Sequence, residues 1–206
     1  MKQILIALIA LLPLYGWAQD NTWEKPEEEE VTEQATVKVN PDAKYLRGAV
    51  PEVNGKIVFS KTIEAPGKSA REVYVIVRKY MEKMLREKNQ INSQLVVNDS
   101  TAFTLAGKYG EWLVFKNNAL VLDRTQLIYV LQADCHDGSA DISISHINYV
   151  YGEGRNMQRY KAEDWISDKY AVNKKNTRLL PLSAKFRRKT IDRKDFLFNK
   201  FETLLK

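Results

Sequence analysis

Two neighbouring segments, 126–135 and 139–151, alternate between apolar and polar residues and flank the dipeptide Asp137-Gly138. This alternation is typical of strands with one buried face, and Asp-Gly is a favoured two-residue hairpin turn. The pattern therefore predicts an antiparallel hairpin that is half buried. The face expected in the core carries Leu127, Tyr129, Leu131, Ala133, Cys135, Ala140, Ile142 and Ile144.

The turn also predicts the register of this hairpin, in which His136 pairs with Ser139 and the pairing continues back to Tyr129 and His146. After Ser145 the apolar positions shift by one residue. Such a shift is typical of a β-bulge, in which two residues of one strand face one residue of the other. We expect this bulge near His146.

Residues 70–87 have a different period, with apolar side chains three or four positions apart. This spacing predicts a helix with one buried stripe. Ser69 and Glu72 have the spacing of a capping box, in which each side chain accepts a hydrogen bond from the backbone N–H of the other residue. They therefore mark the start of the helix. The stripe consists of Val73, Ile76, Val77, Tyr80, Met81 and Met84.

Turn-forming residues divide the sequence on either side of this helix into strands. Asn54-Gly55 favours a tight turn before a strand at about 56–64, which Pro66-Gly67 ends. After the helix, turns at Asn98-Asp99 and at 108–110 are expected. These turns separate three predicted strands, at about 94–98, 101–107 and 111–116.

The last part of the chain is less regular. Residues 162–172 favour a short helix, and 179–186 favour a short edge strand because Pro181 cannot donate a ladder hydrogen bond. Thr190 or Asp192 can then cap a terminal helix of about 14 residues. The apolar face of that helix contains Leu197, Phe198, Phe201, Leu204 and Leu205.

This order of elements predicts an α+β fold, with a curved antiparallel sheet and helices on one of its faces. A single domain would span residues 44–206, with 152–189 as an insertion before the terminal helix. A domain of this length is large enough to build a hydrophobic core without disulfides.

The first 18 residues have the organisation of a secretory signal peptide rather than that of a retained membrane anchor. Lys2 supplies a positive charge, residues 4–14 form an apolar core, and Gly16 and Ala18 suit a signal peptidase. A membrane-spanning helix needs about 20 apolar residues. We therefore expect cleavage after Ala18 and export to the periplasm or the medium. No cysteine follows that position directly, so we do not expect a lipoprotein.

The charges are distributed unevenly along the mature chain. Residues 19–43 are polar, contain the acidic run Glu27–Glu30, and are predicted to form a flexible linker. From residue 40 onward the chain has 29 Lys and Arg against 19 Asp and Glu. A basic domain can bind nucleic acid, but export argues against that partner. Anionic envelope surfaces or glycans are the better candidates, and a merely solubilised surface is the alternative.

Few side chains suit catalysis or metal binding. Cys135 is the only cysteine, so an internal disulfide is excluded, and outside the cytoplasm this thiol is expected to be buried. Cys135 and His136 point to opposite faces of a strand, and His146 lies too far along the ladder for a nucleophile–base pair. Asp134 and Asp141 face each other, and a cation, water or a nearby Lys or Arg would relieve their repulsion. We predict no catalytic residue, no cofactor and no metal site.

Arg187, Arg188 and Lys189 form the densest basic segment of the chain. This segment is a candidate surface patch for docking to an anionic envelope component. The alternative is a solvated region at the start of the terminal helix, on which the acidic linker could fold back at low salt.

Several sequence strings together resemble an exported bacterial family, domain of unknown function 4468. The resemblance covers about residues 45–206. The strings are YLRGAVP at 45–51, GKIVFSKTI at 55–63, LVLDRT at 120–125, AEDWI at 162–166 and KFRRKTID at 185–192.

This resemblance implies a TATA-binding-protein-like fold, a description that also covers helix-grip domains with the order β-α-β(4)-α. That order agrees with the elements predicted above from the residues. The family implies no activity and has no catalytic residues to transfer. A fold name by itself does not imply binding to DNA.

The sequence favours a non-enzymatic binding module whose ligands would be apolar or amphipathic small molecules. In helix-grip folds the terminal helix can leave an apolar cavity against the sheet, and a solid core is the alternative. The residues expected to line this cavity are Tyr129, Leu131, Ile144, Phe198 and Phe201.

A second hypothesis is an interaction or structural protein of the envelope. Aromatic side chains are frequent anchors of protein interfaces. Those of the insertion, Tyr151, Tyr160, Trp165 and Tyr170, would serve as the anchors. An enzyme is the least supported class, because it requires a convergent polar cluster that the spacing does not reveal.

Overall fold

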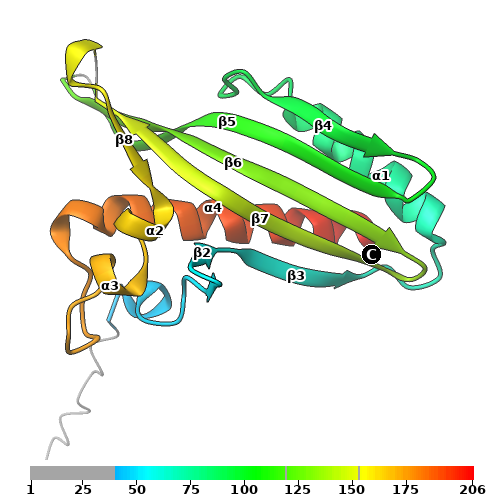
Figure 1. Cartoon of the computed structure of the whole chain (residues 1–206), viewed down its shortest axis with the longest axis horizontal. Coiled ribbons are helices and arrows are strands. Elements are labelled where there is room, and N and C mark those ends of the chain that lie inside the picture. Colours follow the sequence, from blue (N-terminus) through cyan, green and yellow to red (C-terminus); the bar gives the residue numbers. More distant parts are fainter. Residues whose placement is uncertain (1–39, 119, 153) are drawn as a thin grey trace, which may run out of the picture. The chain divides into compact units, whose positions relative to one another are not determined.

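The computed structural model describes residues 40–118, 120–152 and 154–206 (Figure 1). The predicted signal peptide and residues 19–39 of the predicted linker lie outside the described residues. Within the described ranges, no helix is both long enough and apolar enough to cross a membrane. The elements are η1 (Ala43–Tyr45), β1 (Glu52–Val53), β2 (Lys56–Ile57), β3 (Phe59–Glu64), α1 (Ala70–Met84), β4 (Gln94–Asp99), β5 (Thr104–Asn117), β6 (Leu122–His136), β7 (Ser139–Tyr151), η2 (Gly154–Asn156), β8 (Gln158–Lys161), α2 (Ala162–Trp165), α3 (Asp168–Ala171) and α4 (Pro181–Leu205).

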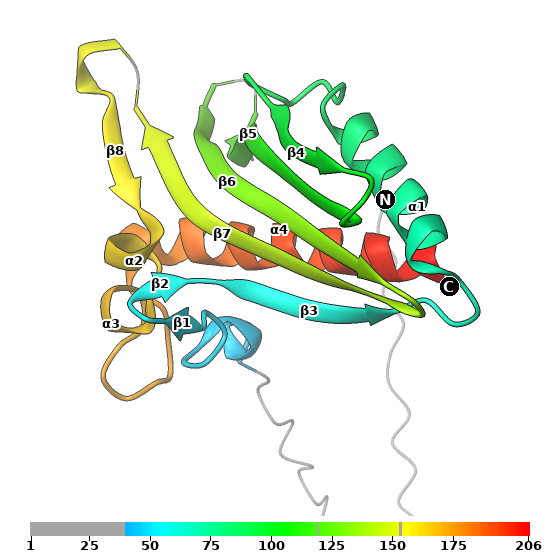
Figure 2. The same cartoon turned by 45° about the vertical axis from the view of Figure 1, so that its right-hand side comes forward.

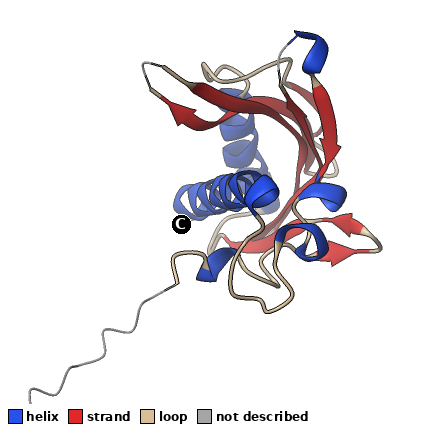
Figure 3. Ribbon diagram, turned by 90° about the vertical axis from the view of Figure 1, so that its left-hand side faces the viewer, coloured by secondary structure: helices blue, strands red, loops and turns tan. Residues whose placement is uncertain are grey.

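The strands of the main sheet have the order β3-β7-β6-β5-β4, and β8 pairs with the end of β7. All pairings in this six-stranded sheet are antiparallel. The sheet curves around α1 and α4, which both lie on its concave face (Figure 3). This arrangement confirms the predicted α+β class and the order β-α-β(4)-α, to which β1, β2, β8, α2 and α3 are added.

The β6–β7 hairpin has the predicted register, with His136 opposite Ser139 and Val130 opposite Ser145. The next pair is Ile128 with Asn148, so two residues of β7 face one residue of β6. His146 lies at this bulge with a positive φ of 53°. The bulge predicted from the shift of the apolar positions is therefore confirmed.

The local signals around α1 are also confirmed. Ser69 caps the helix, and Glu72 completes the capping box. Asn54 and Gly55 both have positive φ values, as a tight turn between β1 and β2 requires. The helix is shorter than predicted, because its regular part ends at Met84 rather than at residue 87.

Residues 108–110 do not form the predicted turn, because they lie inside the single long strand β5. The Tyr109 side chain is fully buried, and its hydroxyl donates to the carbonyl of Met81 (2.9 Å). Gly110 serves a close approach instead of a turn: a Cβ there would lie 2.5 Å from the carbonyl oxygen of Ile91. A glycine inside a strand can therefore be mistaken for a turn signal in the sequence.

The edge strand predicted at 179–186 was wrong, because residues 181–186 belong to the terminal helix. That helix was predicted correctly at its C-terminal end, but its start and its length of about 14 residues were wrong. Helix α4 begins at Pro181 and has 25 residues, with the proline in its first turn. Proline suits that position, because the N–H it lacks would have no partner there. The buried side of the first half includes Ser183, Arg187 and Thr190, so no apolar stripe marks it in the sequence. The insertion therefore ends at residue 180.

Two further boundaries differ from the predictions. The helix expected at 162–172 is divided into α2 and α3. Residues 40–43 belong to the folded unit rather than to a flexible linker, because two of their side chains bind it. Asn40 Nδ2 donates to the Thr177 carbonyl (2.8 Å), and Asp42 pairs with Arg188 (2.7 Å).

The main hydrophobic core lies between the sheet and the two long helices. Tyr80 of α1 and Phe201 of α4 meet there edge to face, with ring centroids 5.1 Å apart. All residues of this core lie between Val50 and Leu205.

Candidate functional site

The residues predicted to line an apolar cavity are all buried in the main core. The space between the sheet and α4 is closely packed, with a void of about 10 Å³ that Tyr129 and Ile144 line. Such a void holds at most one water molecule, whereas small-molecule pockets have volumes of about 300–1,000 Å³. Leu131, Phe198 and Phe201 are buried away from this void. The predicted cavity is thus replaced by the alternative, a solid core.

The predicted basic surface patch is wrong for Arg187. The Arg187 side chain has 0% exposure, and burial lowers its pKa. Its guanidinium donates to the carbonyls of Tyr45, Leu46 and Ile166 at 2.5–2.7 Å and to Asp168 at 2.6 Å. This side chain therefore joins η1, α2, α3 and α4.

The other two members of the patch differ from each other. Arg188 makes a bidentate bond to Asp42, which lowers the pKa of that carboxyl group. Lys189 is exposed. Carbonyl or carboxylate oxygens bind the arginines at two of the three positions, so this segment has a structural role. Of the three side chains, only that of Lys189 offers a free charge in the described unit.

The aromatic anchors proposed for the insertion mostly contact each other. Tyr160 stacks on Trp165 at 4.2 Å, and both rings meet Phe186 of α4. Tyr151 also packs against Phe186, at 5.3 Å. Tyr170 alone is clearly exposed, at 43%. Three of the four rings thus attach the insertion to α4.

Cys135 lies in the core with 4% exposure, as predicted, and burial raises its pKa to about 12. The thiolate is the reactive form of cysteine. We therefore expect almost no reaction of the native protein with a thiol reagent at neutral pH, and one reactive thiol per chain after denaturation. Rapid stoichiometric labelling of the native protein would contradict this burial.

The carboxylates of Asp134 and Asp141 have neutral donors and a histidine around them. Thr104 and Gln132 both donate to Asp134, at 2.9 Å. Asp141 accepts from Thr62 at 2.5 Å and lies 3.3 Å from His136 Nε2. Among the described residues, no three His, Cys, Asp or Glu side chains are grouped to hold a metal ion.

An open groove of about 820 Å³ lies between α1 and α4. Its apolar part consists of Ile76, Tyr80 and Leu204. Tyr80 is 6% exposed, and burial raises its pKa to about 12, so its hydroxyl stays protonated at neutral pH. We call this feature the α1–α4 groove. Its charged residues are Lys79, Glu82, Lys83, Arg86, Glu87 and Lys200.

The four cations of the α1–α4 groove make no ion pair with another described residue. Its two carboxylates already face arginines outside the groove. Glu82 lies 2.8 Å from Arg78, and Glu87 lies 3.8 Å from Arg193. The groove therefore combines an apolar floor with unneutralised positive charge.

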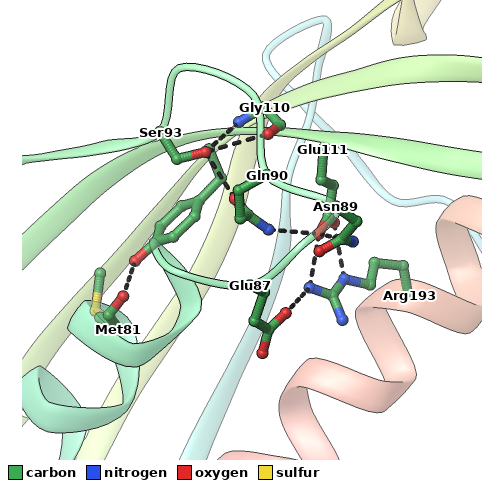
Figure 4. Close-up of polar contacts among 9 residues, drawn as sticks. Met81, Glu87, Asn89, Gln90, Ser93, Gly110, Glu111 and Arg193 are labelled. Atoms are coloured by element: carbon green, nitrogen blue, oxygen red, sulfur yellow. Dashed lines mark hydrogen bonds and ion pairs between the residues drawn. The ribbon is translucent and has the colours of Figure 1, made fainter.

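A buried polar network adjoins this groove at Glu87 (Figure 4). Glu111 of β5 has 1% exposure and accepts two bonds of 2.7 Å from Arg193 of α4. Asn89 and Gln90 donate to the same carboxylate at 3.3 and 3.1 Å. Glu87 faces Arg193 from the other side, so it belongs to both the network and the groove (Figure 4).

Sequence reasoning missed this groove, although one signal was present. Lys79, Lys83 and Arg86 recur at helical spacing beside the apolar stripe of α1. Residues at this spacing lie on one side of a helix. The partner side chain Lys200 comes from α4, and only the packing of the two helices brings it to the same groove.

Comparisons with known proteins show which family and which solved structures this chain is similar to. The model of a family described as "Domain of unknown function (DUF4468) with TBP-like fold" matches residues 59–150. A crystal structure of a DUF4468 family protein from Bacteroides ovatus has a TM-score of 0.74 and 42% identity, covering 80% of this chain and 94% of that one.

A second similar crystal structure is that of a TBP-like protein from Parabacteroides distasonis. It has a TM-score of 0.60 and 21% identity, and the match covers 76% of this chain and 96% of that chain. At this identity the similarity supports the fold alone. No curated protein matches the chain.

Proposed function

Since the chain belongs to the DUF4468 family with its TBP-like fold, we propose that it is an exported, non-enzymatic binding module of the bacterial envelope. The signal-peptide pattern of residues 1–18 supports export. We place the binding site in the α1–α4 groove and propose an anionic single-chain amphiphile, such as a fatty acid, as its ligand class.

The observation that carries this proposal is the charge of the groove. Four cations without an ion-pair partner among the described residues surround the apolar floor of Ile76, Tyr80 and Leu204. An acyl chain on this floor would remove apolar area from water, at about 25 cal/mol per Å². A carboxylate or phosphate head would form charge-assisted hydrogen bonds with Lys79, Lys83, Arg86 or Lys200.

The size of the groove is consistent with such a ligand. A volume of about 820 Å³ lies inside the range of about 300–1,000 Å³ that is common for small-molecule sites. Glu87 of the groove faces Arg193 of the buried network, so this lining side chain needs little further ordering on binding.

We expect the chain lacking residues 1–18 to bind laurate, measured by calorimetry below its micelle concentration. The Lys79→Gln/Lys83→Gln variant should bind at least about tenfold more weakly, since a charge-assisted bond is worth about 1.5–3 kcal/mol. The uncharged amphiphile dodecyl maltoside should bind the native protein more weakly than laurate does.

The Lys174→Gln/Lys175→Gln variant is the matched control, because it removes the same charge from two exposed lysines of the α3–α4 connection. It should bind laurate as the native protein does. Equal weakening of laurate binding in both double variants would show that the effect depends on net charge alone. Unchanged binding in both would show that the groove is not the binding site.

A further inference from the structure

Exposed apolar side chains gather at one end of the sheet, where β5 turns into β6. We call Val114, Leu120, Val121 and Leu122 the β5–β6 tip. Leu120 is 94% exposed, and Leu122 is 50% exposed. Met157, in the connection from β7 to β8, is also 50% exposed and lines the same shallow hollow as Leu122. Both connections lie at the same end of the sheet (Figures 1 and 2).

Three hydrogen bonds within the tip engage part of its backbone. Asn118 accepts hydrogen bonds from the N–H groups of Leu120 (3.2 Å) and Val121 (2.8 Å) through its side chain. Its own N–H donates to the Val121 carbonyl (3.0 Å). A loop with few free backbone groups can enter an apolar environment at low cost, because unsatisfied groups are what make such transfer unfavourable.

The two connections and the strand ends beside them carry more cations than acids. Residues 114–124 and 152–159 contain four Lys or Arg and two acids in the sequence. One of the acids, Asp123, is already bound by Lys185 at 2.6 Å. The guanidinium of Arg124 lies over the Trp112 ring, 3.9 Å from its centroid. The four cations are Lys116, Arg124, Arg155 and Arg159.

We propose that the β5–β6 tip and Met157 insert into the surface of an anionic lipid bilayer. Apolar side chains would reach the boundary of the acyl chains, while the four cations would lie at the level of the lipid phosphates. This surface shares no residue with the α1–α4 groove, so the proposal is independent of the proposed function.

The dimensions of the surface favour a bilayer over a protein partner. A stable protein interface uses about 20–30 residues on each side. The tip and Met157 present five large apolar side chains on two connections. A narrow projection of this kind suits insertion between lipid headgroups, where a few apolar side chains and nearby cations act together.

The test uses the chain lacking residues 1–18 and vesicles of phosphatidylcholine with or without phosphatidylglycerol. We expect flotation with the anionic vesicles, weaker flotation with pure phosphatidylcholine, and loss of binding at high salt. The Leu120→Asp variant should bind the anionic vesicles at least about tenfold more weakly, because burial of one leucine corresponds to a factor of ten or more.

Leu182→Asp is the matched control, because Leu182 is 78% exposed at the start of α4 and is not one of the tip residues. It should bind as the native protein does. A Leu120→Trp variant gives a second readout, in which the added tryptophan emission should shift to the blue and be quenched by brominated lipid.

Three results would overturn the proposal. These are absence of binding to either vesicle, equal loss of binding in Leu120→Asp and Leu182→Asp, and an unshifted emission of Leu120→Trp on bound protein. Loss of vesicle binding in Lys79→Gln/Lys83→Gln, with Leu120→Asp unaffected, would instead place the membrane contact at the α1–α4 groove.

Discussion

Replacement of Arg187 by methionine is expected to destabilise the folded unit by about 3–5 kcal/mol, as is usual when one partner of a buried ionic contact is removed. The change leaves the carbonyls of Tyr45, Leu46 and Ile166 without their donor. It also removes the charge that faces Asp168. Methionine has a similar length and is apolar, so the loss would reflect missing hydrogen bonds rather than a cavity.

Urea denaturation of the chain lacking residues 1–18, followed by far-ultraviolet circular dichroism, measures this effect. Lys189→Met is the matched control, because it removes an exposed cation two positions along the same helix. A surface change of this kind costs within about 0.5 kcal/mol. If the two variants had the same midpoint, Arg187 would not be the structural link described above.

Replacement of Glu111 by methionine should have an effect of similar size, also about 3–5 kcal/mol. Arg193 would then lose both of its 2.7 Å hydrogen bonds and keep only Glu87, at 3.8 Å, as an ion-pair partner. Asn89 and Gln90 would lose their common acceptor. Glu87 of the α1–α4 groove faces Arg193 of this network, so laurate binding should weaken as well.

The double variant Glu111→Met/Arg193→Met separates the pair from the surrounding packing. Because both charges are removed together, it should be more stable than the sum of the two single changes implies. Glu82→Met is the control, since its pair with Arg78 is exposed and is worth at most about 1 kcal/mol. Strict additivity of the two buried changes would argue against a direct interaction of Glu111 with Arg193.

The sequence was most informative where the governing interactions are local. The capping box of Ser69 and Glu72 acts within one helical turn, and the positive φ values of Asn54 and Gly55 are needed within one tight turn. The bulge at His146 follows from the alternation of the strand itself. Each of these features could be predicted because the residues that determine it lie a few positions apart.

The predictions from sequence were wrong where contacts with residues distant in the chain determined the local structure. Lys108-Tyr109-Gly110 resembles a turn, but the buried Tyr109 ring and the approach of Ile91 to Gly110 place it in a strand. The first half of α4 lacks an apolar stripe, because its buried side contacts the backbone of η1 and α2 through Arg187. A polar side chain can be buried when distant carbonyls satisfy it, and no local period records this.

By itself the sequence determined the α+β class, the β6–β7 register with its bulge and the start of α1. Hydrogen-bonded turns and side-chain alternation act over short distances, so a linear pattern is sufficient for them. Tertiary structure alone decided that the space under α4 is filled, that Arg187 is buried, and that Lys200 joins the cations of α1 in one groove. These properties depend on how closely side chains from distant segments pack: Arg187 and its acceptor Tyr45 are 142 positions apart.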